Sequence, residues 1–270
     1  MTLLVHTPID FPYTTDLFRT TSSTLPPRYA QAHSIREAHI ILRSEGNEIV
    51  IEPRTPTMRK CYDETRLPLG NPTHLPAALD GVAHFIYLLD CYNEASPLRG
   101  IALEMHRLLG DFPHRRPDLS VGHDGNMVKG GAVLFASEEG AKYGFTIRNT
   151  SPEDLFPYLF YFDPEDFTVQ LWYSPQDAST PPLKSGGTVT LGMGDEPAYQ
   201  FALELDQLQS SGFLKLFVAT EYSDLGWIQQ KLSPFDPLFH SNRANPHAEE
   251  QLDRVPKWDA LTVMLTMTAE

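Results

Sequence analysis

Histidines and carboxylates gather in one stretch of the chain. His106, His114, Asp118, His123 and Asp124 fall within nineteen consecutive positions. Imidazole nitrogens and carboxylate oxygens bind divalent metal ions, so His106, His114, His123 and Asp124 are the candidate metal ligands. Their spacing matches neither the HExxH motif nor a zinc finger, and the Asp-Gly pair at Asp124 favours a tight turn. A solvated loop is therefore the simpler interpretation, and no cofactor is expected.

A second candidate site consists of aromatic side chains. Trp172, Tyr173 and Trp227 can stack against sugar rings if the fold places them on one sheet face. The acidic turn from Asp163 to Asp166 offers oxygen ligands to calcium, but it lacks EF-hand periodicity. Aromatics at strand positions are more often core residues or cross-strand pairs, and an acidic hairpin tip is common.

Nucleophile and nucleotide motifs are incomplete. Gly192 and Gly194 begin a GxG pattern without a third glycine, and the chain contains neither a P-loop nor a GxSxG elbow. Cys91 has no sequence context that supplies a histidine base. The two carboxylates of a glycoside hydrolase need to be close in space but not in the sequence, so glycoside hydrolysis stays open as a function. No catalytic residue is predicted.

The elements that must position these residues are mostly strands. One helix is expected after Pro76, because apolar residues then recur at spacings of three and four. These residues are Leu79, Val82, Ala83, Ile86 and Leu89. A hairpin is expected around residues 45–47, and a strand over residues 101–107. Seven or eight further short strands are expected downstream, among them an alternating run at residues 199–205.

These elements predict a mainly β protein with an antiparallel, immunoglobulin-like β-sandwich and an N-terminal α+β extension carrying one helix. Residues 1–34 are polar and contain prolines, which predicts a flexible or docked arm. The α+β part is expected to cover residues 35–122, and the sandwich residues 123–270.

Composition restricts partners and compartment. Lys and Arg number 21 and Asp and Glu 35, giving a formal charge of −14, which disfavours nucleic acid. The two cysteines make no disulfide scaffold. No secretory signal and no apolar run long enough to span a bilayer is present, so a cytoplasmic location without membrane attachment is expected.

Several runs resemble the C-terminal, non-peptidase region of basidiomycete fungal caspase-like, metacaspase-type proteins. The runs cover residues 75–90, 101–110, 138–175, 181–194, 211–236 and 256–269. In such proteins a peptidase domain with a His–Cys dyad precedes this region. Neither dyad context occurs here, since Asp90-Cys91 with Ser96 imitates the nucleophile context poorly. The resemblance therefore implies an accessory region without catalytic residues.

Three functions follow as hypotheses. The first is a non-catalytic binding or regulatory module that contacts a protein partner, such as a caspase-like peptidase domain. The second is a lectin-like carbohydrate-binding defence protein that uses the aromatic residues. The third is a hydrolase whose site is assembled only in space. The sequence does not indicate an oligomeric state.

Overall fold

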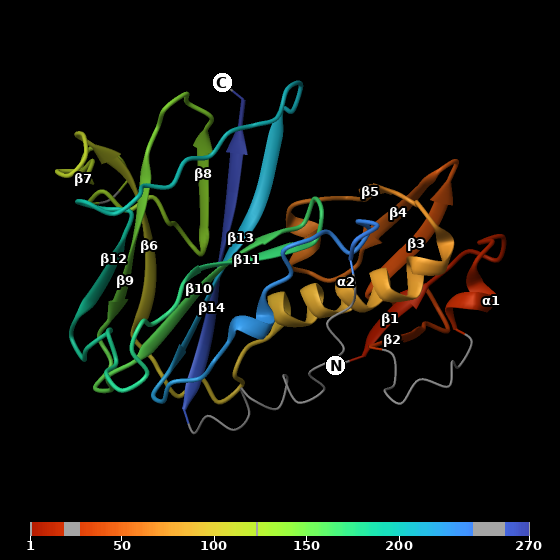
Figure 1. The fold of residues 1–270 in the computed structure, drawn as a ribbon, viewed down its shortest axis with the longest axis horizontal. Coiled ribbons are helices and arrows are strands. Elements are labelled where there is room, and N and C mark those ends of the chain that lie inside the picture. Colours follow the sequence, from red (N-terminus) through yellow and green to blue (C-terminus); the bar gives the residue numbers. More distant parts are fainter. Residues whose placement is uncertain (1, 19–27, 123, 240–256, 270) are drawn as a thin grey trace. The chain divides into compact units, whose positions relative to one another are not determined.

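The computed structural model describes residues 2–18, 28–122, 124–239 and 257–269. The chain divides into two compact units (Figure 1). The first comprises Met1–Cys91, Phe162–Gln170 and Gly226–Glu249, and the second comprises Tyr92–Tyr161, Leu171–Leu225 and Glu250–Glu270. The predicted boundaries at residues 34 and 122 are therefore not those of the compact units.

The first unit contains a five-stranded sheet in the order β2-β1-β3-β4-β5. Its strands are β1 (Leu3–His6), β2 (Tyr29–Gln31), β3 (Ile40–Glu45), β4 (Glu48–Pro53) and β5 (Thr65–Pro68). Strand β1 pairs in parallel with β2 and β3, whereas β3, β4 and β5 form an antiparallel meander. Parts of the expected arm are thus strands of this sheet: β2 forms its edge, and β1 lies next to it with Leu3 and Val5 almost completely buried. Residues 19–27 of that arm lie outside the described residues.

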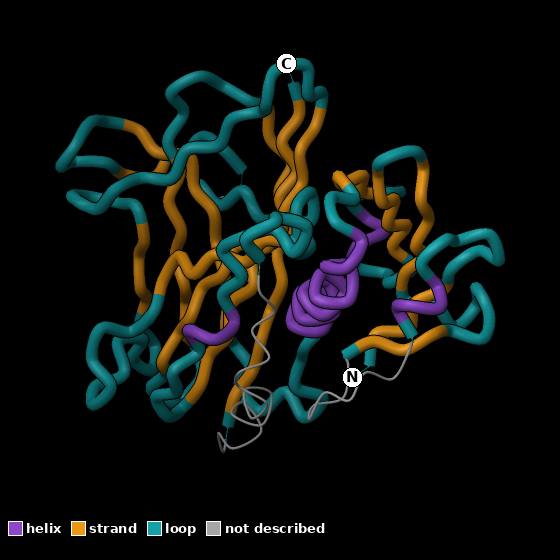
Figure 2. The backbone as a smooth tube through the Cα atoms, turned by 45° about the vertical axis from the view of Figure 1, so that its right-hand side comes forward, coloured by secondary structure: helices purple, strands orange, loops and turns teal. Residues whose placement is uncertain are grey.

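Helix α2 (Leu75–Asp90) confirms the predicted helix. Its Pro76 lies in the first turn, where the missing N–H has no partner to lose. Phe85 is fully buried and meets Phe162 and Phe167 edge to face, with ring centroids 5.2 and 5.3 Å apart. Figure 2 looks almost along the axis of this helix. The short helices are α1 (Thr14–Leu17), η1 (Met58–Lys60), η2 (Pro72–His74) and η3 (Gly226–Ile228).

The second unit is built on two sheets, which confirms the expected β-sandwich. Their orders are β11-β10-β13-β14-β8 and β12-β9-β6-β7. The strands are β6 (Ile101–Leu109), β7 (Arg116–Pro117), β8 (Ala132–Ala136), β9 (Tyr143–Asn149), β10 (Phe156–Asp163), β11 (Thr168–Tyr173), β12 (Thr188–Leu191), β13 (Gln209–Ala219) and β14 (Trp258–Thr268). Most pairs are antiparallel, but β8 pairs with β14 in parallel. Strand β6, expected in the α+β part, belongs instead to the sandwich.

One apolar core joins the two sheets of this unit. Met105 and Phe145 from one sheet pack in the same cluster as Leu216 and Leu265 from the other. Each of these side chains is at most 3% exposed, and burying one such residue contributes about 1.5–3 kcal/mol.

The strand predicted at residues 199–205 is absent. Tyr199 makes a single bridge to Tyr143, and Phe201 packs partly against the core. Strand β9 begins at Tyr143 and pairs with β12 and β6, so no strand is left to pair with the residues that follow Tyr199. Leu205 consequently stands in solvent, 97% exposed.

Candidate functional site

The structure does not assemble the predicted metal ligands. His106 on β6 is buried, and its Nδ1 donates to the Gly125 carbonyl at 2.8 Å while its Nε2 accepts from the Thr146 hydroxyl at 3.1 Å. His114 and Asp124 are exposed in loops, and His123 lies outside the described residues. Among the residues that the structure describes, no three His, Cys, Asp or Glu side chains gather as metal ligands would. His106 is a hydrogen-bonding core residue.

The aromatic candidates are divided between the two units. Trp172 stacks on Tyr161 with ring centroids 4.9 Å apart and approaches Tyr199 at 4.7 Å, so it belongs to the packing of the second unit. Tyr173 is half-buried in the same unit. Trp227 belongs to the first unit, where its ring meets His84 edge to face.

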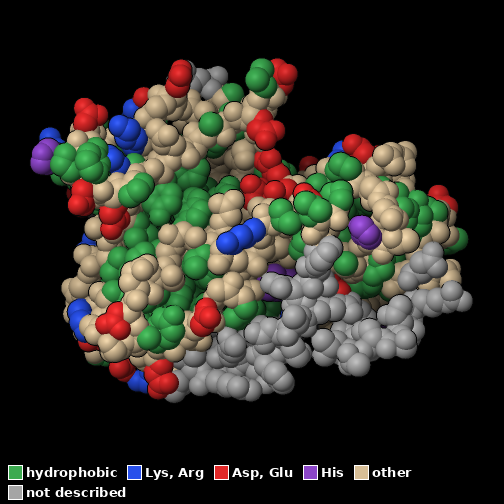
Figure 3. All heavy atoms as spheres, in the orientation of Figure 1, with side chains coloured by type: hydrophobic (Ala, Val, Ile, Leu, Met, Phe, Trp, Pro, Cys, Tyr) green, Lys and Arg blue, Asp and Glu red, His purple; other side chains and the backbone are tan. Residues whose placement is uncertain are grey.

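The acidic turn uses its carboxylates within the fold. The Asp163 side chain accepts the Glu165 N–H, and the Asp166 side chain accepts the Thr168 N–H. Glu165 accepts a hydrogen bond from the Tyr62 hydroxyl at 2.7 Å. These bonds shape a hairpin tip, which is the simpler of the two interpretations that the sequence left open. In the part of Figure 3 occupied by the second unit, acidic side chains lie mainly toward the margins and hydrophobic ones between them.

A buried polar cluster in the first unit has no counterpart in the sequence predictions. His84 on α2 accepts from Arg28 Nη1 at 2.9 Å and donates from Nε2 to the Ile228 carbonyl at 3.1 Å. Asp80, one turn earlier, accepts the Arg28 N–H. Burial and the neighbouring Arg28 charge lower the pKa of His84 from 6.5 to about 4. The cluster keeps a neutral imidazole in the core.

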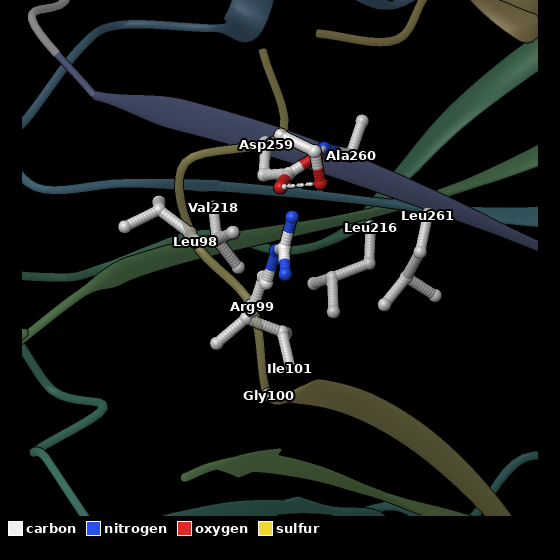
Figure 4. Close-up of a pocket in the computed structure, with 10 residues that line it drawn as sticks. Leu98, Arg99, Gly100, Ile101, Leu216, Val218, Asp259, Ala260 and Leu261 are labelled. Carbon is white, nitrogen blue, oxygen red and sulfur yellow. Dashed lines mark hydrogen bonds between the residues drawn. The ribbon is translucent and has the colours of Figure 1, made fainter. Parts of the chain in front are cut away.

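A candidate ligand site is a cavity of about 280 Å³ in the second unit, shown in Figure 4. Its lining comes from three places: the segment before and at the start of β6, the end of β13, and the start of β14. The lining residues are Ser96, Leu98, Arg99, Gly100, Ile101, Leu216, Val218, Asp259, Ala260 and Leu261. The cavity therefore lies between β6 of one sheet and the adjacent strands β13 and β14 of the other, where the sandwich is open.

Strand β6 leaves part of one edge unpaired at this cavity. Even-numbered residues face β9, because Gly100 accepts from the Thr150 N–H and Leu108 donates to the Lys142 carbonyl. Odd-numbered residues face the other way, and the Met105 carbonyl there accepts the N–H of residue 127. Alternation places the N–H and C=O of Ile101 on this outer edge. They have no backbone partner within the described ranges.

Strand β14 presents a matching free edge. Its even-numbered residues face β8, since the Met264 N–H donates to the Gly131 carbonyl. The pairing with β8 starts only at Met264, so the edge groups of Ala260 and Thr262 extend beyond the end of β8. The Ala260 N–H bonds to the Asp259 side chain at 2.8 Å. The Ala260 carbonyl and both backbone groups of Thr262 have no backbone partner among the residues described.

The segment before β6 is fixed to β14. The Ser96 hydroxyl donates to Asp259 at 2.9 Å, and Asn93 Nδ2 donates to the Trp258 carbonyl at 2.7 Å. Ser96 has a φ of 38°, a left-handed conformation that is strained for a residue other than glycine. Such strain persists only where surrounding contacts hold it, and it often marks a functional position. The segment is thus held in one conformation before any ligand arrives.

Two charged side chains line the cavity, those of Arg99 and Asp259. Figure 4 shows the Arg99 side chain passing between the apolar walls and pointing toward Asp259. Arg99 is exposed, and no carboxylate of the described chain forms an ion pair with it. Arg107 and Arg148, by contrast, each pair with a glutamate, at 2.6 and 3.0 Å. The cavity therefore offers an available guanidinium beside an apolar surface.

No family model, no curated protein and no solved structure matches the chain. No helix within the described residues is both long enough and apolar enough to cross a membrane. Sequence reasoning did not select Arg99, Ile101 or Asp259, because their residue types carry no motif. Only the ends of the strand pairings show that these residues border an open edge.

Proposed function

We propose that the chain is a non-catalytic binding module that holds an extended segment of a protein partner between β6 and β14. The observation that carries the proposal is the unpaired edge of Ile101 beside the cavity, with the unpaired edge of Ala260 and Thr262 on the opposite side. An added strand gains main-chain hydrogen bonds from such an edge and specificity from the side-chain pockets along it. Exposed edges otherwise invite unwanted pairing.

The polar groups of the cavity favour binding over catalysis. Its hydroxyl, on Ser96, donates to Asp259, and none of the residues that line the cavity is a histidine that could complete a nucleophile–base pair. Asp259 also accepts the Ala260 N–H, so the carboxylate serves to shape the strand. A fixed carboxylate, a free guanidinium and an apolar wall are a recognition surface.

The resemblance seen in the sequence supplies a partner class. It suggests that the bound segment comes from a caspase-like peptidase domain, which makes the module regulatory. The immunoglobulin-like type of the sandwich and a cytoplasmic location belong to the same proposal. Cys61 and Cys91 form no disulfide in the described structure, which is compatible with a reducing compartment.

Amide protection tests where a segment binds. Random peptides displayed on phage are panned on the whole protein, and selected peptides are added to isotope-labelled protein for hydrogen exchange by NMR. We expect the Ile101 amide to gain protection on binding, because an added strand accepts its N–H. The Ala102 amide is the internal control, since the β6–β9 pairing already uses its edge.

Two outcomes contradict the proposal. One is that panning enriches no peptide over a bare surface. The other is that selected peptides bind while Ile101 and Thr262 keep their exchange rates and amides elsewhere become protected.

A further inference from the structure

We propose that the segment bound at this edge is the carboxyl terminus of a protein whose last residue is aliphatic. The Arg99 guanidinium binds the terminal carboxylate, and the last side chain enters the cavity between the sheets. The inference rests on the proposed function, because it specifies which part of a partner chain occupies the same edge.

Charge gives the first argument. Arg99 lies in a protein of net charge −14, yet the described residues leave its guanidinium without an ion pair. Arg43, Arg54 and Arg66 in the first unit all pair with glutamates, so acidic side chains are used widely on this surface. Arginine binds a carboxylate through two parallel N–H bonds, which fixes the orientation of the bound group.

Size and polarity give the second argument. The walls on either side of Arg99 are formed by five apolar side chains, those of Leu98, Ile101, Leu216, Val218 and Leu261. Leu216 is fully buried, and Leu98 and Val218 are at most 3% exposed, so the floor of the cavity is continuous with the core. A volume of about 280 Å³ is below the range typical of drug-sized ligands and suits one amino-acid residue.

Chain direction gives the third argument. Arg99 comes two positions before Ile101, at the end of the edge where β6 begins. Among the described residues only Ile101 and Leu103 are open on this edge, because the Met105 carbonyl already accepts the Met127 N–H. A short strand that pairs antiparallel with these two residues runs toward Arg99, so its last residue lies beside the guanidinium, and the residues before it leave the edge ahead of Met105. The main-chain carboxylate at the end of the bound peptide therefore lies beside the guanidinium. The peptide needs no acidic side chain at this position.

The loop geometry holds Arg99 in place. Gly100 has a φ of 90°, and its carbonyl accepts both the N–H and the hydroxyl of Thr150, at 2.8 and 2.9 Å. A Cβ at Gly100 would collide with the Thr150 side chain, so glycine is needed at this close approach. Ligand binding thus costs little ordering of the loop itself.

A free amino acid shares the same chemistry but fits less well. Its ammonium would need Asp259, whose two oxygens already accept bonds from Ser96 and from the Ala260 N–H. It would also leave the outer edge of Ile101 unpaired. A peptide terminus satisfies both the guanidinium and the strand edge.

The test measures binding of defined peptides by fluorescence polarisation. Fluorescein-labelled hexapeptides ending in leucine or valine are compared with the same peptides ending in a carboxamide. N-acetyl-leucine and free leucine are added as competitors. The variants are Arg99→Gln and, as a matched control, Arg116→Gln, which removes an exposed positive charge from β7.

We expect the carboxylate peptides to bind at least 10-fold more tightly than the carboxamides. A charge-assisted bond of this kind has a strength that corresponds to about a 10- to 100-fold change in affinity. Arg99→Gln should lose the same factor, and Arg116→Gln should stay within about 2-fold. N-acetyl-leucine should compete better than free leucine.

Equal binding of carboxylate and carboxamide peptides, with Ile101 still protected, overturns the inference and leaves the proposed function standing. Failure of both the carboxylate and the carboxamide peptides to bind overturns the inference together with the proposed function. An Arg99→Gln variant that binds like the unmodified protein also overturns the inference. A circular dichroism spectrum and melting temperature confirm that each variant is folded.

Discussion

His84 on α2 makes the stability of the first unit dependent on pH. Its imidazole is 6% exposed, accepts from Arg28 Nη1 and donates to the Ile228 carbonyl. Burial is the main cause of its lowered pKa, and the Arg28 charge adds to it. Asp80 is the acidic group nearest in the chain, and it accepts the Arg28 backbone N–H. Protonating His84 would place a second cation beside Arg28 in the core.

The size of the effect follows from the two pKa values. The folded value is about 4 and the ordinary value is 6.5. Above pH 6.5 both states hold His84 neutral, so the full stability is present. Below pH 6.5 His84 becomes protonated in the unfolded chain but not in the folded one, so the free energy of unfolding falls until the pH reaches about 4. The loss amounts to about 2 kcal/mol between pH 7 and 5, and about 3 kcal/mol in full.

Urea unfolding at pH 7, 6 and 5 measures this loss, with His84→Gln as the reference. Glutamine does not titrate, and it can still accept from Arg28 and donate to the Ile228 carbonyl. Carboxylates titrate in both proteins, so their contribution cancels in the difference. We expect the stability advantage of the unmodified protein over the His84→Gln variant to shrink by about 2 kcal/mol from pH 7 to 5. NMR titration of the imidazole gives the folded pKa directly.

The reasoning fails if the two proteins lose stability in parallel over this range. It also fails if the folded imidazole titrates near 6.5. Either result would mean that water reaches His84 or that a counter-charge compensates Arg28. Burial would then not be the cause of the lowered pKa, although the hydrogen bonds of His84 would be unaffected.

Three further predictions concern packing. Phe85→Ala should lower the free energy of unfolding by about 3–5 kcal/mol, since its ring is fully buried; a loss below about 1 kcal/mol in urea would contradict this. Gly212→Ala should cost about 1–3 kcal/mol, because the new methyl meets the Tyr161 ring, and Tyr161→Leu in the same chain should recover part of it in thermal melts. Trp172→Ala should cost about 3–5 kcal/mol by urea unfolding, whereas a sugar-binding role would leave stability almost unchanged.

Local patterns predict the helix and most strands. Pro76 and the spacing of Leu79, Val82 and Ile86 are contained in one continuous segment, and they define α2 without reference to the rest of the chain. Strand β1 has no such pattern, because its partners β2 and β3 begin at Tyr29 and Ile40, far along the chain. Parallel pairing of such distant segments leaves no local signature.

Alternation predicts which side chains are apolar together but not whether a backbone partner exists. Tyr199 and Phe201 do pack against the core, as their spacing suggests, although the backbone there is not in a strand. The same limit applies to the metal and sugar hypotheses, because a residue's type does not show which neighbours the fold gives it. His106 and Trp172 have chemically capable side chains, but tertiary packing uses them within the second unit.

The position of the open edge is determined by the residues at which the strand pairings of β6 and β14 end. Strand β8 pairs with β14 only from Met264 onward, and the Met105 carbonyl is the place on β6 where the covering segment bonds. Ile101, Ala260 and Thr262 are ordinary strand residues, and their types say nothing about an edge. An exposed edge is usually blocked by a charge or a bulge, because it invites aggregation. Here the nearby charges are Asp259, whose carboxylate bonds to Ser96 and to the Ala260 N–H, and Arg99, which is directed into the cavity and forms no ion pair within the described residues. A guanidinium so placed is what a carboxylate-binding edge requires.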